Sequence, residues 1–364
     1  MKEINLIVGC TWDFEQLDLI IRLNKKHKDK NIRVSELYGS LRSSYIPLPS
    51  ARPDYRIPNV NIDHFRRFVA KARDNNIGIN YTCNGTFIGS IEEIHTTENV
   101  IGDSFKMLEE IGIFRLTLSN PLLIEIARAY CVIPIDISTI LHPTFIASLP
   151  TYSEWNVDKV HMNVYLNRNI QYLKKYNDAA QKYRIRPCLI TNEFCMFGAS
   201  PCSGILRDAC YNCSTTGGNE KGYFSNWPFE RCHTARMENP VAWLSACFIL
   251  PQHLRFYRKE TGISNFKITG RTNPIKYVTF LIETYLSENY QGELLKLWVD
   301  PGKSAKSQIK KEFNVKVSEL EYVDFFSKWF SNKHPQCDFS CGIGCNWCQE
   351  KWEEILKRRD INDK

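Results

Sequence analysis

The sequence predicts an α/β protein built as a (β/α)8 TIM-type barrel, with a cysteine-rich insertion after strand 7 and a small cysteine-rich C-terminal element. Short β-rich runs alternate with amphipathic segments along about the first 270 residues, and this alternation is typical of a parallel sheet. Eight such units have the length of a (β/α)8 barrel. The predicted strands are residues 5–9, 33–38, 78–83, 114–118, 132–138, 159–162, 186–191 and 265–268.

The segments between these strands carry apolar residues at three- and four-residue spacing, which predicts helices with one buried face. Two examples are Phe14, Leu17, Ile20 and Ile21 in one segment and Phe65, Phe68, Val69 and Ala72 in the next.

Polar or small residues follow every predicted strand. They are Cys10, Gly39 and Ser40, Asn84, Ser119 and Asn120, His142, Asn163, Asn192 and Glu193, and Gly270 and Arg271. In a (β/α)8 barrel these positions meet at the C-terminal face, where active sites are built. The sequence therefore predicts a site at that end of the barrel.

Two long segments interrupt the regular spacing. Residues 40–58 are too many for an ordinary connection and are predicted to form a lid in which Arg42, Arg52 and Tyr55 clamp a substrate. Residues 195–239 form the insertion after strand 7. We expect residues 1–290 to make the barrel with this insertion, and residues 291–364 to make an appended extension. Its predicted packing residues are Trp329, Phe330, Trp347 and Trp352.

The insertion contains five of the 14 cysteines, as Cys195-x6-Cys202-x7-Cys210-x2-Cys213-x18-Cys232. A chain of this length needs no disulfide framework, so clustered thiols predict thiolate metal ligands. The uneven gaps and the place at a barrel mouth favour a [4Fe–4S] cluster over zinc, which prefers paired CxxC knuckles. The expected ligands are Cys195, Cys202 and Cys232, with Cys210 or Cys213 as the fourth; an iron left open for substrate is the other arrangement.

A second cluster, Cys337-x3-Cys341-x3-Cys345-x2-Cys348, lies in the extension. Its short gaps and its glycines suit either a second [4Fe–4S] cluster or a structural zinc. Its last three cysteines have the CxxxCxxC spacing of radical S-adenosylmethionine enzymes, but they follow the barrel instead of its first strand. That chemistry is kept as an alternative. The remaining cysteines lie in apolar runs and are expected to be small core residues and not metal ligands; they are Cys10, Cys83, Cys131, Cys188 and Cys247.

Composition sets few limits. Subtracting 40 acidic from 47 basic residues leaves +7, an excess that suits an anionic substrate or RNA but is too diffuse for a nucleic-acid footprint. No export signal follows Met1 and no apolar stretch reaches membrane-spanning length, so we expect a cytoplasmic protein without a membrane partner.

Phe266-Lys267-Ile268-Thr269-Gly270-Arg271, followed by Asn273-Pro274 and Tyr277-Val278, resembles the signature of the peptidase U32 family. Asn192-Glu193 before the cysteines is similar to that family too, although Thr269 replaces its usual Glu and a His-Gly pair is missing. The resemblance implies an iron–sulfur protein of oxygen-independent hydroxylation, in which prephenate supplies oxygen to a ubiquinone precursor or an RNA base. It also implies homo- or hetero-oligomers, and a collagenase-like peptidase is its other implied activity.

The residue types suggest roles at the predicted mouth. Arg271 can hold the carboxylate of a small anionic substrate or co-substrate with two parallel hydrogen bonds. Glu193 is a candidate general acid or base, and His233, with His142 and His161, is a candidate for proton transfer. The competing interpretations are an Arg271–Glu193 salt bridge and a non-catalytic partner subunit that uses its metals only for folding.

Overall fold

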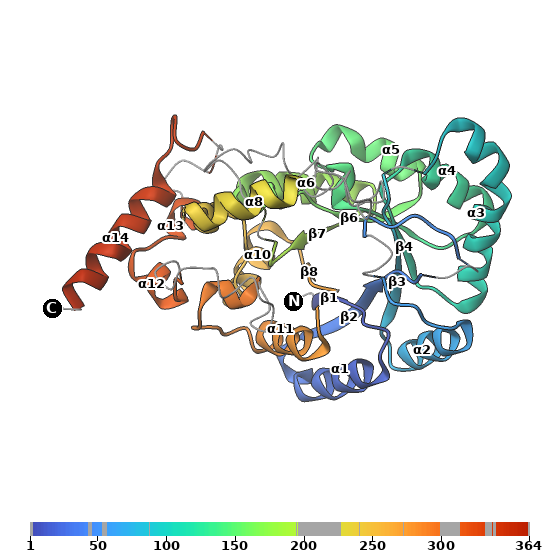
Figure 1. The fold of residues 1–364 in the computed structure, drawn as a ribbon, viewed down its shortest axis with the longest axis horizontal. Coiled ribbons are helices and arrows are strands. Elements are labelled where there is room, and N and C mark those ends of the chain that lie inside the picture. The colour runs from blue at the N-terminus through green and yellow to red at the C-terminus, as the bar shows by residue number, and fades with distance from the viewer. Residues whose placement is uncertain are drawn as a thin grey trace.

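Eight parallel strands close into a barrel in the order of the sequence (Figure 1). The computed structural model describes residues 3–42, 46–52, 57–86, 88–193, 195, 227–239, 241–271, 273–298, 314–331, 337 and 340–362. The strands are β1 Ile4–Gly9, β2 Ile32–Gly39, β3 Gly78–Cys83, β4 Arg115–Leu118, β5 Ile135–Ile137, β6 Val157–His161, β7 Arg186–Ile190 and β8 Asn265–Ile268. The predicted barrel is confirmed, and every predicted strand overlaps an observed one.

The largest boundary difference is in β5. The sequence predicts a strand from residue 132, whereas β5 begins at Ile135 and Val132 is 83% exposed. Pro134 explains the shift, because proline has no N–H to donate to a neighbouring strand. Its carbonyl still accepts a hydrogen bond from Leu116 N at 3.0 Å, so pairing starts just after it.

Helices surround the barrel and begin where the sequence offers capping side chains. Asp13 caps α1, Ser90 forms a capping box with Glu93 at α3, and Asn120 caps α4 ahead of Pro121. The barrel helices are α1 Phe14–Lys26, α2 Ile62–Asp74, α3 Ile91–Ile111, α4 Pro121–Tyr130, α5 Leu149–Glu154, α6 Ile170–Lys182, α8 Trp227–Glu238, α9 Val241–Ser245, α10 Leu254–Thr261 and α11 Ile275–Ser287.

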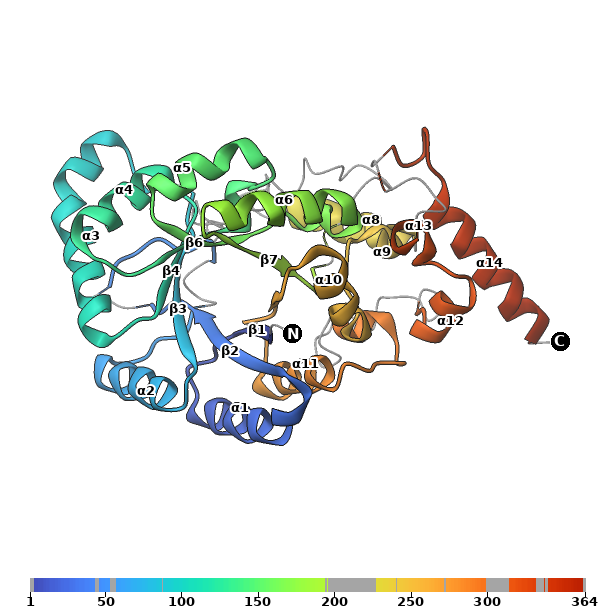
Figure 2. The same cartoon turned by 180° about the vertical axis from the view of Figure 1, so that it is seen from behind.

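The C-terminal extension contains α12 Val317–Tyr322, α13 Ser327–Phe330 and α14 Trp347–Asn362. Figures 1 and 2 both place these helices at one end of the molecule, opposite α2, α3 and α4, and α14 lies against α9. Trp329 and Trp352 are buried in the same hydrophobic core as the barrel helices. The extension is therefore packed onto the barrel.

The main hydrophobic core lies between the sheet and the helices, and the interior of the barrel is mostly polar. Ile4, Leu6 and Val8 of β1 belong to the main core, whereas Ile7 joins a small separate cluster with Tyr38 and Cys188. The buried polar residues of the strands are Glu36, Asn80, Thr82, Arg115, Thr117, Asp136, Lys159, His161, Asn265 and Lys267. Branched apolar side chains usually fill such barrels, so this polar interior is a distinguishing feature of the chain.

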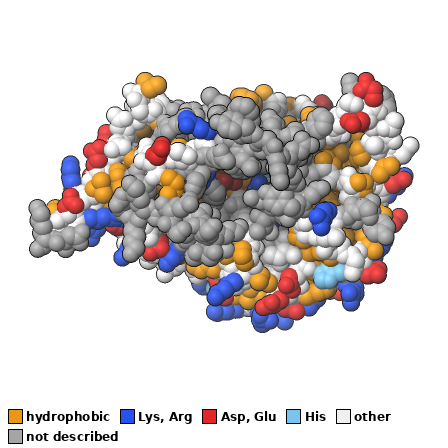
Figure 3. All heavy atoms as spheres, viewed as in Figure 1, with side chains coloured by type: hydrophobic (Ala, Val, Ile, Leu, Met, Phe, Trp, Pro, Cys, Tyr) orange, Lys and Arg blue, Asp and Glu red, His pale blue; other side chains and the backbone are white. Residues whose placement is uncertain are grey.

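None of the helices in the described part of the chain combines the length and apolar character needed to cross a bilayer. On the face drawn in Figure 3, basic and acidic side chains are interspersed along the edge formed by α1 and α2.

Candidate functional site

The C-terminal ends of β1 and β8 come together at Arg271. A Cβ atom on Gly9 would lie only 2.5 Å from Arg271 Cα, so glycine is required where β1 ends. Ser50, from the segment that the sequence predicts as a lid, accepts a hydrogen bond from Arg271 Nη2 at 3.3 Å. Ala51 N donates to Asn84 Oδ1 at 3.2 Å, beyond the end of β3. The segment 46–52 therefore lies over the mouth of the barrel.

Arg271 is an incompletely satisfied cation. Its Nη1 is buried and has no hydrogen-bond partner among the residues that the structure describes. Burial, followed by the charge of Arg52, lowers the pKa of Arg271 to about 10, which leaves the side chain charged at neutral pH. The predicted alternative of an ion pair with Glu193 is not observed between these two described residues. A buried arginine with a spare donor is suited to bind an anion.

Glu193 and Cys195 follow β7 and contact each other. The Cys195 Sγ donates to Glu193 Oε1 at 3.4 Å. Burial raises the pKa of Tyr38 to about 12, and the charges of Arg271, Arg52 and Glu193 all act on its hydroxyl. The residues predicted from the ends of β7 and β8 therefore share one mouth.

Asn192, just before Glu193, has a structural role. Its Oδ1 accepts hydrogen bonds from Thr269 N at 2.6 Å and from Thr269 Oγ1 at 3.1 Å. Its Nδ2 donates to Leu297 O at 3.1 Å, which links the end of β7 to the chain beyond α11. Thr269, the residue that departs from the U32 signature, thus holds the ends of β7 and β8 together.

Two of the five predicted iron–sulfur ligands are described, Cys195 and Cys232. Both are half-buried, and Arg236 Nη2 donates to Cys232 Sγ at 2.6 Å within α8. Cys202, Cys210 and Cys213 lie outside the described residues, as does the side chain of His233. Tyr55 of the predicted lid also lies outside them.

All four cysteines of the extension are described. Burial, followed by Cys337, Cys348 and Cys345, raises the pKa of Cys341 to about 11. Within the described residues, however, no three Cys, His, Asp or Glu side chains are gathered in a metal-binding arrangement. Both metal sites remain predictions.

The remaining histidine candidates differ in environment. His142 adopts a positive φ of 52° and its Nδ1 lies 3.4 Å from Asn163 Nδ2 at the strand ends. His161 is fully buried in the lumen, where burial and then the charge of Lys267 lower its pKa to about 3. It is neutral at physiological pH.

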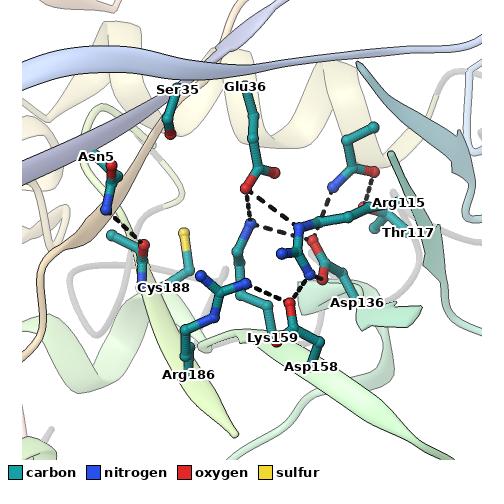
Figure 4. Close-up of polar contacts among 12 residues, drawn as sticks. Asn5, Ser35, Glu36, Arg115, Thr117, Asp136, Asp158, Lys159, Arg186 and Cys188 are labelled. Carbon is teal, nitrogen blue, oxygen red and sulfur yellow. Dashed lines mark hydrogen bonds and ion pairs between the residues drawn. The ribbon is translucent and has the colours of Figure 1, made fainter. Parts of the chain in front are cut away.

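Sequence reasoning missed an ion network inside the barrel (Figure 4). Lys159 Nζ lies 2.5 Å from Glu36 Oε1 and 3.4 Å from Asp136 Oδ2. Because β2 and β6 are not neighbouring strands, the first contact crosses the lumen. Arg115 Nε lies 3.4 Å from the same Glu36 oxygen. Burial opposes ionisation of Asp136, but Lys159, aided by His161 and Arg115, holds its pKa well below the usual value.

The network continues to the N-terminal end of the barrel, where Asp158 pairs with both Arg115 and Arg186. A cavity of about 580 Å³ opens there, lined by the first residues of several strands, among them Gly78, Arg115 and Arg186. Its Arg115 and Arg186 are paired with acids, so we regard this end as structural. One sequence pattern could have revealed the network: charged residues occur within strands whose other residues are mostly apolar.

Lys267 of β8 is not part of this ion network. Its Nζ lies 4.0 Å from the ring centroid of Tyr38, and no carboxylate of the described residues pairs with it. Burial lowers the pKa of Lys267 to about 8. Lys267 and Arg271 together therefore make the upper lumen electropositive.

The chain is 23% identical to an uncharacterized protease of Methanocaldococcus jannaschii, over 95% of this chain and 97% of that protein. Among solved structures it is similar to a U32 peptidase, with 9% identity, 62% of this chain and 85% of that chain covered, and a TM-score of 0.44. The chain resembles the U32 family. This U32-like chain also matches a β-1,4-mannanase, with 10% identity, 79% and 100% coverage and a TM-score of 0.36. No protein-family model matches it.

Proposed function

We propose that this U32-like chain is an iron–sulfur-dependent enzyme that hydroxylates a small molecule or an RNA base without molecular oxygen. The observation that carries the proposal is Arg271, a buried cation whose Nη1 has no hydrogen-bond partner among the described residues. An anionic co-substrate would supply that partner. The proposal places the protein in the reducing cytoplasm, where thiols persist as metal ligands.

Each residue of the mouth has a defined task in this proposal. Arg271 binds the carboxylate of the co-substrate, and Lys267 adds a second positive charge deeper in the lumen. Glu193 transfers a proton at its carboxylate oxygen. Cys195, Cys202, Cys232 and one of Cys210 and Cys213 would hold a [4Fe–4S] cluster, which supplies redox and Lewis-acid chemistry when bound.

The reaction needs no external oxidant. A C–H bond of the target becomes C–OH, and the oxygen comes from a hydroxyl group of the co-substrate. The co-substrate is left with hydrogen in place of that hydroxyl, so one molecule is oxidised and the other reduced by the same two electrons. The resemblance names prephenate as a co-substrate of this kind, and prephenate carries the carboxylates that Arg271 would recognise.

The decisive experiment follows the oxygen. Anaerobically purified protein is incubated with RNA or a phenolic quinone precursor and with prephenate whose hydroxyl carries an oxygen isotope. We expect a product heavier by one labelled oxygen atom, detected by mass spectrometry. Label that enters the product from water or from molecular oxygen would rule out this reaction, and the absence of any oxygenated product from both target classes would rule out hydroxylation.

A matched pair of cysteine variants tests the cluster. Cys202→Ser should abolish the broad absorption near ~400 nm expected of a [4Fe–4S] centre. Cys131→Ser, at a half-buried thiol that caps α4, serves as the control and should leave the spectrum unchanged. Full iron content in Cys202→Ser would exclude Cys202 as a ligand.

A peptidase is the second candidate, because the relative from Methanocaldococcus jannaschii is named a protease. Digestion of denatured collagen by the purified protein, with loss of activity in an Arg271→Lys or Glu193→Gln variant, would favour this candidate. Cleavage that survives both substitutions would be assigned to a contaminant, since both side chains lie at the mouth.

A further inference from the structure

Arg168 is a buried arginine outside the proposed active site. It ends the short helix η5 Val164–Arg168 after β6 and is only 2% exposed. Its Nη2 donates to two backbone carbonyls, Leu244 O at 2.5 Å and Ala246 O at 2.6 Å. Its guanidinium carbon lies 4.4 Å from the ring centroid of Trp329, in α13. The side chain therefore joins the barrel to the C-terminal extension.

The charge of Arg168 has no carboxylate partner among the described residues, and its Nε has no hydrogen-bond partner there. Arginine keeps its proton in proteins, and an uncompensated buried charge is strongly unfavourable. Carbonyls and aromatic rings offset part of this cost but bring no negative charge. The groups near Arg168 that can carry a negative charge are thiols. Its Nη1 donates to Cys348 Sγ at 3.6 Å, and the charges of Cys247 and Cys337 also act on it.

The chain around the extension's cysteines forms a tight turn. Ser340 O accepts hydrogen bonds from Gly344 N at 2.8 Å and Cys345 N at 3.1 Å, and Gly342 N donates to Cys345 O at 3.0 Å. Gly342 has a φ of +77°, a conformation that glycine adopts without strain. Cys341 and Cys345 pair through their backbones across this turn. The turn brings two thiols to one place, beside the first turn of α14 with Cys348.

We propose that Cys337, Cys341, Cys345 and Cys348 bind one metal centre as thiolates and that Arg168 balances its negative charge. Four thiolates around Zn²⁺ or a [4Fe–4S] core carry a net charge of roughly −2, and this negative charge would offset that of the buried guanidinium. The four sulfurs are not gathered around one point in the structure. Cys341 and Cys345 are half-buried, so their side chains have room to turn toward a metal.

The centre would fasten the extension to the barrel. Arg168 holds the carbonyls of Leu244 in α9 and of Ala246 just after it with one nitrogen, and Cys348 of α14 with the other. Metal binding would then set the position of α14 against α9. This inference does not depend on the proposed hydroxylation, because it concerns a separate set of ligands.

Metal counts in the full-length protein provide the first test. Iron and zinc per chain are measured after anaerobic purification for the wild type, Cys345→Ser and Cys348→Ser, with Cys131→Ser as the control. We expect both extension variants to lose one zinc, or the iron of one cluster, and Cys131→Ser to lose neither. Cys202→Ser should retain this metal. Zinc loss identifies a structural zinc site and iron loss a second cluster; unchanged metal in both extension variants would overturn the proposal.

Arg168 is tested as a positioning residue. Arg168→Gln removes the charge, whereas Arg168→Lys keeps it, and metal affinity is measured for each by competition with a coloured chelator. We expect the affinity to fall about 10- to 100-fold in the Gln variant, as for other residues that support metal ligands, and to be largely restored in the Lys variant. Equal affinities in wild type and Arg168→Gln would overturn the assigned role. Circular dichroism shows that the variants compared are folded.

Discussion

Charged side chains are paired at the N-terminal end of the barrel lumen but not at its C-terminal end. At the N-terminal end, three acids (Glu36, Asp136 and Asp158) contact three bases (Arg115, Lys159 and Arg186). At the C-terminal end, Lys267 and Arg271 have no carboxylate partner among the described residues. Removing one member of a balanced network leaves a buried charge without its partner, so the network stabilises the fold only when it is complete. A cation without a carboxylate partner can instead bind an anion from solvent. The difference separates the structural end of the lumen from the candidate site.

The largest effect is expected from breaking the lower network. Asp136→Ala leaves Lys159 and Arg115 without one of their carboxylates, and loss of one partner from a buried ion pair typically costs 3–5 kcal/mol, so we expect a loss of about 4 kcal/mol. Denaturant unfolding measures it. Asp178→Ala is the matched control, because its pair with Lys174 is exposed and should contribute less than about 1 kcal/mol. Similar midpoints for the two variants would contradict a structural role for the network.

The next effect concerns Arg271, the buried cation at the mouth. Arg271→Lys keeps the charge but cannot make the proposed two-pronged contact with a carboxylate, so binding of the proposed co-substrate prephenate should weaken by roughly 1.5–3 kcal/mol, or about 10- to 150-fold. Titration calorimetry measures the affinity, and thermal unfolding measures stability beside it. A less stable protein with unchanged affinity would remove Arg271 from the site.

A smaller effect should appear in the pH dependence of anion binding. Lys267 loses its proton at about pH 8 in the folded protein, so affinity for an anion should fall above pH 8, by up to about tenfold per pH unit. Lys267→Met should show weaker binding without this decline. An identical pH profile in both proteins would place the anion away from Lys267.

The same lysine predicts the opposite trend for stability without ligand. The unfolded chain holds this proton up to its ordinary pKa of 10.5, whereas the folded chain releases it at about 8. Because the unfolded state binds more protons between these values, the free energy of unfolding should rise from pH 8 to 10.5. Lys267→Met should lack this contribution, which unfolding curves across that range would reveal.

The smallest effect is expected where the two strand ends are joined. Thr269→Val removes the hydroxyl bond to Asn192 Oδ1 but retains the backbone bond to the same oxygen, so we expect a loss of about 0.5–1.5 kcal/mol. Denaturant unfolding again provides the measurement. A loss as large as that of Asp136→Ala would show that this junction, and not only the ion network, holds the barrel closed.

The sequence by itself determined the barrel and the place of its mouth. Strand and helix periodicities are local properties, so alternation along the chain was enough to find all eight strands and to put Arg271 and Glu193 at strand ends. It could also single out the cysteines of the extension, because their spacing is short. Its errors were mainly in strand boundaries such as the start of β5, where Pro134 delays the pairing.

Only the tertiary structure decided which charges are paired. Glu36 and Lys159 are 123 residues apart and meet because β2 and β6 face each other across a closed barrel. Arg168 and Cys348 are 180 residues apart and meet because the extension folds back onto the barrel. Such contacts depend on strand register and on how the barrel closes, which no local pattern encodes. The same closure brings Arg271 to the mouth, where none of the described residues pairs a carboxylate with it, and so creates the candidate site.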